Sequence, residues 1–174
     1  MKPLYSGIFI GVLISLLNPG MARQTTEISN RPAQSSLAEL KRVARPLLIF
    51  STDALNTHFQ KQLEFLHVTS REDKTGAGEL TERRVVLIPI LESGEYLPTT
   101  GASLFHLLPV DEASRLRKEF GVKPGEFETV LIGTDGTAKK VWRTPVRLQS
   151  VLELIDGMPG RQSERREAER HPPR

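Results

Sequence analysis

Short apolar runs separated by amphipathic segments mark this chain and predict a β-sheet covered by helices. The runs lie at residues 46–50, 85–90 and 130–132. None of them alternates apolar with polar residues, which is typical of strands that are buried on both faces. A fourth strand is expected near 138–143, because the Asp135-Gly136 pair before it suits a two-residue hairpin turn.

Apolar positions at helical spacing predict three helices between or after these strands. We expect Asp111 to cap the second helix, and Thr144, which precedes a proline, to cap the third. Gln62 and Arg117 fall among the polar positions of their helices, and we expect both to face solvent. The three apolar stripes are Phe59, Leu63 and Leu66; Ala113, Leu116 and Phe120; and Leu148, Val151, Leu152 and Ile155.

The connections between these elements carry further predictions. Residues 70–78 are polar and contain two glycines, so they are expected to form a loop. Residues 91–108 combine turn formers with several apolar side chains, and a connection of this length is either functional or locally folded. Pro89 cannot donate a backbone hydrogen bond, so it is expected at the end of its strand or at a bulge.

The order of elements then fixes the fold class. A helical crossover makes the strands at 46–50 and 85–90 parallel, whereas a tight hairpin makes the last two strands antiparallel. The expected fold is α/β, with a mixed central sheet in the order βαβαββα and helices on both faces.

Residues 1–22 have the three parts of a secretory signal peptide. Lys2 gives a positive start, residues 7–17 form an apolar core, and small residues precede Ala22. The core is shorter than the roughly 20 residues that cross a bilayer. We therefore expect cleavage after Ala22 rather than a membrane anchor, no stable membrane span after cleavage, and a secreted or periplasmic protein.

The rest of the chain divides by composition into three parts. Residues 23–44 form a polar N-terminal arm, in which Ser36 and Glu39 have the spacing of a helix-capping box. Residues 45–159 contain all the predicted strands and the three main helices. Residues 160–174 alternate arginine with glutamate, which is typical of a frayed helix or a disordered tail.

Charge and cysteine content exclude some classes of function. With 24 basic and 21 acidic residues, the excess of positive charge is too small to indicate nucleic-acid binding. The chain has no cysteine, so it offers no disulfide, no thiolate metal ligand and no thiol nucleophile. The four histidines show no metal-ligand spacing, and no metal or other cofactor is indicated.

Four segments resemble an uncharacterised family of short exported bacterial proteins that carry a domain of unknown function with a thioredoxin- and peroxiredoxin-like core. The same segments are similar to domains of vertebrate sushi-repeat and matrix proteins. The resemblance runs from about residue 45 to residue 166 and implies a thioredoxin-like fold. The segments are RPLLIF at 45–50, FGVKPGEF at 120–127, VLIGTDG at 130–136 and LIDGMP at 154–159.

The resemblance also locates a candidate surface. The reactive cysteine of thioredoxins lies where the first strand meets the first helix, and here Ser51, Thr52 and Asp53 occupy that corner. The resemblance places Glu126 and Phe127 opposite the corner, with Phe127 at the position of the family's cis-proline. Without a thiolate, disulfide exchange has no attacking atom. We therefore expect a binding or interaction module with an unknown protein or envelope ligand.

An enzyme that does not use a thiol is the alternative hypothesis. Thr52, His58 and Asp53 contain the residue types of a hydroxyl–imidazole–carboxylate set, and a hydrolase would need them within hydrogen-bond reach of one another. A cap or turn role for Asp53 and a first-turn position for His58 explain the same residues more simply.

Overall fold

The structure is a computed structural model that describes residues 36–69, 75–99 and 101–170. The predicted signal peptide and most of the predicted N-terminal arm lie outside these residues. The elements are α1 (Ser36–Leu40), β1 (Arg45–Ser51), α2 (Thr57–Phe65), α3 (Thr75–Glu82), β2 (Val85–Leu91), η1 (Ala102–Leu104), α4 (Val110–Glu119), β3 (Glu128–Ile132), β4 (Ala138–Trp142), α5 (Leu148–Asp156) and α6 (Pro159–Arg170).

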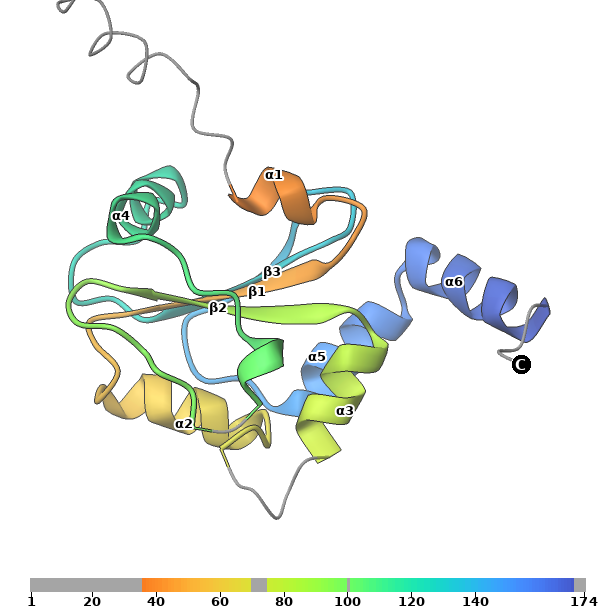
Figure 1. Cartoon of the computed structure of the whole chain (residues 1–174), viewed down its shortest axis with the longest axis horizontal. Coiled ribbons are helices and arrows are strands. Elements are labelled where there is room, and N and C mark those ends of the chain that lie inside the picture. Colours follow the sequence, from red (N-terminus) through yellow and green to blue (C-terminus); the bar gives the residue numbers. More distant parts are fainter. Residues whose placement is uncertain (1–35, 70–74, 100, 171–174) are drawn as a thin grey trace, which may run out of the picture. The chain divides into compact units, whose positions relative to one another are not determined.

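A four-stranded mixed sheet in the order β2-β1-β3-β4 forms the centre of the domain (Figure 1). β1 pairs with β2 in parallel and with β3 in antiparallel orientation, and β3 pairs with β4 in antiparallel orientation. All residues of β1 and β3 are buried, as their continuous apolar runs predicted. The fold is the predicted thioredoxin-like α/β arrangement.

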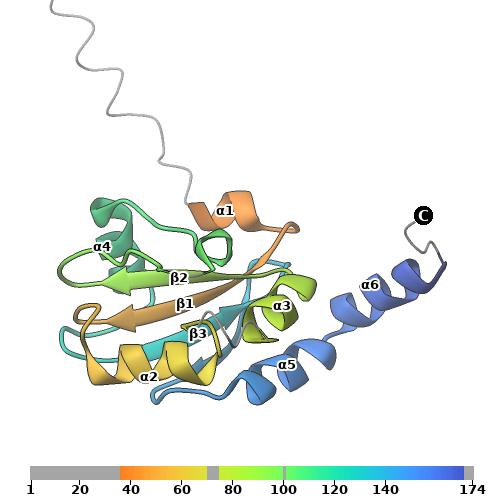
Figure 2. The same cartoon turned by 60° about the horizontal axis from the view of Figure 1, so that its bottom comes forward.

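Alternate residues of the strands build two apolar layers. Leu47 and Ile49 of β1 face a layer to which α2, α3 and α5 contribute. Leu48 and Phe50 face the opposite layer, which α4 completes and against which α1 packs. Figures 1 and 2 show α1 and α4 on one side of the sheet and α2, α3 and α5 on the other.

The predicted loop at 70–78 is wrong over its last part, because α3 begins at Thr75. Gly76 lies so close to the backbone of Leu66 that a Cβ at this position would overlap its carbonyl oxygen, whereas Leu80 on the same helix is fully buried. The glycine thus serves helix packing rather than a loop.

Two predicted helix starts are also wrong. α4 begins at Val110 with Pro109 at its N-cap, so Asp111 lies in the first turn and is not the cap. α5 begins at Leu148 rather than at Thr144, because the preceding backbone is held by a buried side chain. Gln62, which was predicted to be solvated, is fully buried. It accepts a hydrogen bond from the Val146 amide at 2.8 Å and donates one to its carbonyl at 3.0 Å.

The hairpin between β3 and β4 is longer than the predicted two-residue turn. The Gly136 amide donates to the Gly133 carbonyl, and the Gly133 amide donates to the Thr137 carbonyl, both at 2.9 Å. Gly136 has a φ of 82°, whereas Asp135 is not among the residues with positive φ. A turn followed by one left-handed glycine is the usual form of a three-residue hairpin loop.

The charged C-terminal segment does not begin as a free tail. Arg45 at the start of β1 is 1% exposed, and its Nη2 lies 2.9 Å from the Glu164 Oε1 on α6. Burial raises the pKa of the Glu164 carboxyl, but hydrogen bonds and charge from Arg45 and Arg84 outweigh it, and the net pKa is lowered. Arg161 on α6 is also buried and pairs with Glu82 at 2.5 Å. The predicted boundary at residue 160 therefore cuts through a packed helix.

Candidate functional site

The corner after β1 is closed by hydrogen bonds among its own residues. The Asp53 carboxylate accepts from the Thr52 hydroxyl at 2.9 Å and from the Leu55 amide at 2.8 Å. The Thr52 hydroxyl in turn accepts from the Asn56 amide group at 3.1 Å, and Asn56 caps α2. Ser51 is fully buried, so of the three predicted corner residues only Thr52 and Asp53 keep partial exposure.

The hydroxyl, imidazole and carboxylate of the alternative hypothesis do not form a relay. The Thr52 hydroxyl donates directly to Asp53. The His58 ring instead contacts the Phe127 ring, with centroids 5.4 Å apart. No hydrogen bond between the His58 imidazole and either partner is found among the described residues, so this geometry does not place a base between the hydroxyl and the carboxylate.

The predicted residues opposite the corner differ in exposure. Phe127 is buried, and its peptide bond is not cis. Glu126 is exposed and accepts from the Lys123 amide at 3.1 Å, which closes the turn before β3. The two predicted segments do meet, because the Glu92 amide donates to the Ser51 and Thr52 carbonyls while its carboxylate accepts from the Gly125 amide at 2.8 Å.

Arg117 ties these segments together, although the sequence pattern had placed it in solvent. Its guanidinium donates to the carbonyls of Ser51 at 2.6 Å and Ile90 at 3.2 Å. It also donates to the Lys123 carbonyl and pairs with Glu92 at 3.0 Å. Burial lowers the pKa of the guanidinium, and the neighbouring carboxylate partly offsets this effect. The carboxyl ends of β1 and β2 and the turn before β3 are thus fixed relative to one another.

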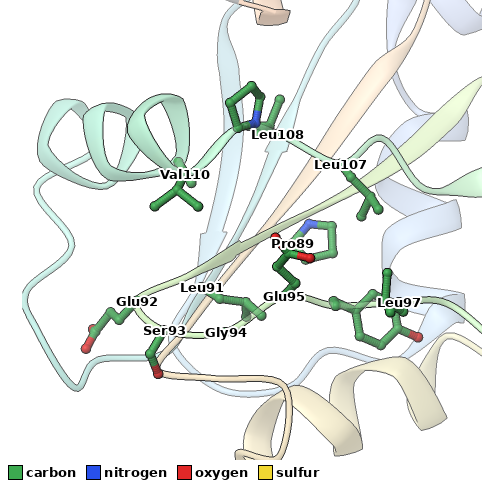
Figure 3. A pocket seen from close by; sticks show the side chains of 13 residues that line it. Pro89, Leu91, Glu92, Ser93, Gly94, Glu95, Leu97, Leu107, Leu108 and Val110 are labelled. Carbon is green, nitrogen blue, oxygen red and sulfur yellow. The ribbon is translucent and has the colours of Figure 1, made fainter.

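A groove lies beside this cluster, at the outer edge of β2, and Figure 3 shows it from close by. We call it the β2 groove, and it has a volume of about 300 Å³. Leu97, Leu107 and Val110 line it and are 73%, 48% and 68% exposed, which is unusual for three neighbouring aliphatic side chains on a small domain. Its lining residues are Pro89, Leu91, Glu92, Ser93, Gly94, Glu95, Tyr96, Leu97, Leu107, Leu108, Pro109, Val110 and Ala113.

Aromatic contacts hold the walls of the β2 groove in place. The Tyr96 ring lies 5.2 Å from the Phe59 ring and 5.1 Å from the Phe105 ring, measured between centroids. Burial raises the pKa of the Tyr96 hydroxyl. Beyond Tyr96, Phe105 pairs with Leu87 in an isolated parallel bridge. The segment 91–108 is thus packed onto the domain through Tyr96, Leu104 and Phe105, whereas its Leu97 and Leu107 stay exposed and line the groove.

Over residues 36–164, the chain matches the protein family described as "Domain of unknown function (DUF4174)". The chain belongs to this family. The match begins with α1 and ends within α6, so it contains the whole sheet and the β2 groove. A search of curated proteins finds no match.

Solved structures similar to this DUF4174 chain include peroxiredoxins from parasites and a bacterium. Plasmodium yoelii thioredoxin peroxidase I has 14% identity over 79% of this chain and 82% of its own, with a TM-score of 0.48. Peroxidoxin BcpB from Mycobacterium tuberculosis has 18% identity over 70% and 84%, with a TM-score of 0.49. Plasmodium vivax 2-Cys peroxiredoxin has 15% identity over 73% and 84%, with a TM-score of 0.48.

No helix within 36–69, 75–99 and 101–170 is long and apolar enough to span a membrane. No group of three or more histidine, aspartate or glutamate side chains in the same residues is placed to hold a metal ion.

Proposed function

We propose that this protein is an exported binding module without thiol chemistry and that the β2 groove is its binding site. The observation that supports this proposal most directly is the exposure of Leu97, Leu107 and Val110 around one groove. Contiguous exposed apolar surface marks interaction or ligand sites, and concave apolar sites with a few polar groups are the usual form of ligand sites.

The position of the groove agrees with this proposal. Ligands of open α/β sheets bind outside the carboxyl ends of parallel strands, and the groove adjoins the end of β2. The predicted corner at Thr52 and Asp53 lies on the neighbouring parallel strand, but its polar groups bond to one another. We therefore place the ligand at the groove, whose lining does not include Thr52, Asp53 or Glu126.

Binding of a neutral apolar dye tests the site. N-phenyl-1-naphthylamine, whose fluorescence rises when it leaves water, should bind the folded protein saturably. Leu97→Asp and Val110→Asp should each weaken binding severalfold, because both replace groove side chains by charges. Leu55→Asp is the matched control, since Leu55 is 88% exposed and is not part of the groove lining. Equal loss in the control, or no saturable binding by the unchanged protein, would contradict the proposal.

Export is the second part of the proposal and needs its own experiment. The support for it is the charge, apolar core and small residues of the segment up to Ala22. Expression of the full sequence in a bacterium should give an envelope or culture-medium product whose N-terminus, determined by mass spectrometry, is Arg23. A product that stays in the cytoplasm and begins at Met1 would refute export without affecting the binding proposal.

A further inference from the structure

We infer that the ligand of the β2 groove is an extended peptide that adds to the outer edge of β2, with a basic side chain close to Glu95. This inference rests on the proposed function and names the chemical class of the ligand. It depends on three features of the groove, which are the direction of the backbone groups of β2, the shape of the walls and the sign of the charge.

The backbone of β2 has an unpaired stretch on the side of the groove. The amide of Glu92, the residue after β2, donates to carbonyls at the end of β1. Backbone groups of successive residues point to opposite edges of a strand, so the odd-numbered residues of β2 direct theirs away from β1. Leu87 shows this directly, because its carbonyl accepts from the His106 amide at 2.9 Å on the outer side. Pro89 and Leu91 are also odd-numbered, so their backbone groups point to the same outer side. No described segment accepts from the Leu91 amide.

The chain that covers the outer edge leaves it after one bridge. Phe105 pairs with Leu87, after which residues 107–109 lead away to the start of α4. The β2 groove opens between this segment, Leu91 and Leu97. A next strand would lie about 4.8 Å from β2, which is the place that the groove occupies. An extended peptide there would hydrogen-bond with Leu91 and with the Pro89 carbonyl.

Pro89 limits how far such pairing can extend. It has no amide hydrogen, so this edge offers one donor, at Leu91, where an unbroken strand would offer two. The structure corrects the prediction that Pro89 lies at a strand end or bulge, because it is in register opposite Ile49 in the middle of the edge strand β2. An edge position tolerates proline when its missing donor faces outward. The groove therefore suits a short peptide rather than a long strand.

The charge of the groove selects among peptides. Its lining contains two carboxylates, Glu92 and Glu95, and no lysine or arginine, although the whole chain has a net charge of +3. Glu92 is engaged by Arg117. Glu95 is exposed, and no ion pair to it is found among the described residues. A lysine or arginine of the ligand can pair with Glu95 while apolar side chains contact Leu97 and Val110.

Fluorescence anisotropy with designed peptides tests the inference. The probe is the acetylated, fluorescently labelled heptapeptide Lys-Val-Thr-Val-Thr-Val-Lys, whose two lysines allow either strand direction. A second peptide has its valine and threonine amides N-methylated, so that neither edge of the strand can donate, and a third has glutamate in place of both lysines. Loss of two backbone hydrogen bonds should weaken binding about tenfold or more, so the first peptide should bind at least about tenfold more tightly than the second.

Variants of the protein locate the peptide. Glu95→Lys should weaken binding of the lysine peptide and strengthen binding of the glutamate peptide. In a nitrogen–proton correlation spectrum, the Leu91 amide should shift on titration with the lysine peptide. Leu55→Asp should change neither result, because Leu55 is not part of the groove.

Several outcomes would overturn the inference. Equal binding of the first two peptides would mean that the groove takes apolar groups without strand pairing. Absence of binding at about 1 mM peptide, the upper end of weak affinities, would exclude a peptide ligand. Self-association of the protein through the same edge, seen by sedimentation and lost in Leu97→Asp, would make a second copy the occupant. In the first two cases, dye binding that depends on Leu97 would leave the proposed function intact.

Discussion

Replacement of Arg117 by methionine tests whether this side chain holds the carboxyl end of the sheet together. Methionine keeps a flexible chain of similar length but cannot donate to the carbonyls of Ser51 and Ile90 or pair with Glu92. Hydrogen bonds to a charged group contribute about 1.5–3 kcal/mol each, and removal of one partner of a buried pair costs about 3–5 kcal/mol. Glu92 keeps partial access to water, so we expect a loss of about 3 kcal/mol in the free energy of unfolding.

Urea unfolding followed by circular dichroism measures this loss. The matched control is Arg115→Met on the same helix. Arg115 is 43% exposed and pairs with Glu112 at 3.4 Å, so its removal should cost less than about 1 kcal/mol. Arg117→Lys should recover only part of the stability, because an ammonium cannot reach several carbonyls in the planar geometry of a guanidinium. A change below about 1 kcal/mol in Arg117→Met, with unchanged dependence on urea, would refute the role assigned to Arg117.

Two other predictions concern helix packing and pH. Gly76→Ala should destabilise the protein by about 1–3 kcal/mol, because the new Cβ would overlap neighbouring backbone. Gly78→Ala on the same helix is the control and should stabilise the protein by up to about 1 kcal/mol, since a Cβ there meets nothing within 4 Å. Thermal unfolding measures both variants, and equal changes in stability would contradict the close packing at Gly76. The Asp156 carboxylate accepts two hydrogen bonds from Arg83, which together with its charge lower the pKa of Asp156 despite opposing burial. A lowered folded-state pKa adds stability that is present above the usual aspartate pKa of about 3.9 and is lost as the pH falls through the folded value. Chemical unfolding from pH 6 downward should therefore show a decline below about pH 4 that is smaller in Asp156→Asn, and an identical decline in that variant would refute the assignment.

The sequence allowed the sheet to be predicted because its strands are buried on both faces. A strand such as β3 needs apolar residues at every position, and this requirement leaves a continuous run that can be read without knowing the neighbours. The parallel pairing of β1 with β2 followed from the helical crossover between them. The position of Pro89 in the middle of β2, in register with Ile49, could not be predicted, because it depends on which strand forms the edge of the sheet.

The sequence-based predictions were wrong mainly for polar residues that are buried in the structure. Gln62 and Arg117 lie on amphipathic helices, where a polar residue normally faces water. Arg117 follows Ala113 by four positions, the spacing of the apolar stripe, and that position was the one signal in the sequence for its burial. Gln62 had the same signal, since it follows Phe59 by three positions and precedes Leu66 by four. Its partner Val146, however, is far away in the chain and becomes a neighbour only after folding.

The predicted corner and the β2 groove have no residue in common. The corner at Thr52 and Asp53 lies at the carboxyl end of the sheet, as expected, yet two of the five predicted residues, Ser51 and Phe127, are buried. The β2 groove could not be predicted from the sequence, because its walls come from two separate segments, residues 91–97 and 107–113. The distance between these segments in space depends on the aromatic contacts of Tyr96. The sequence indicated only that the connection at 91–108 was long enough to have a function.

The ion pair between Arg45 and Glu164 bears on where this domain can be cut for expression or fusion. A fragment that stops at residue 159, after the last apolar helix, would retain every strand but leave the Arg45 guanidinium inside the protein without its carboxylate. The family match extends to residue 164, the position of that carboxylate. We therefore expect that a fragment of this chain must include α6 at least to Glu164 if the charge of Arg45 is to be balanced.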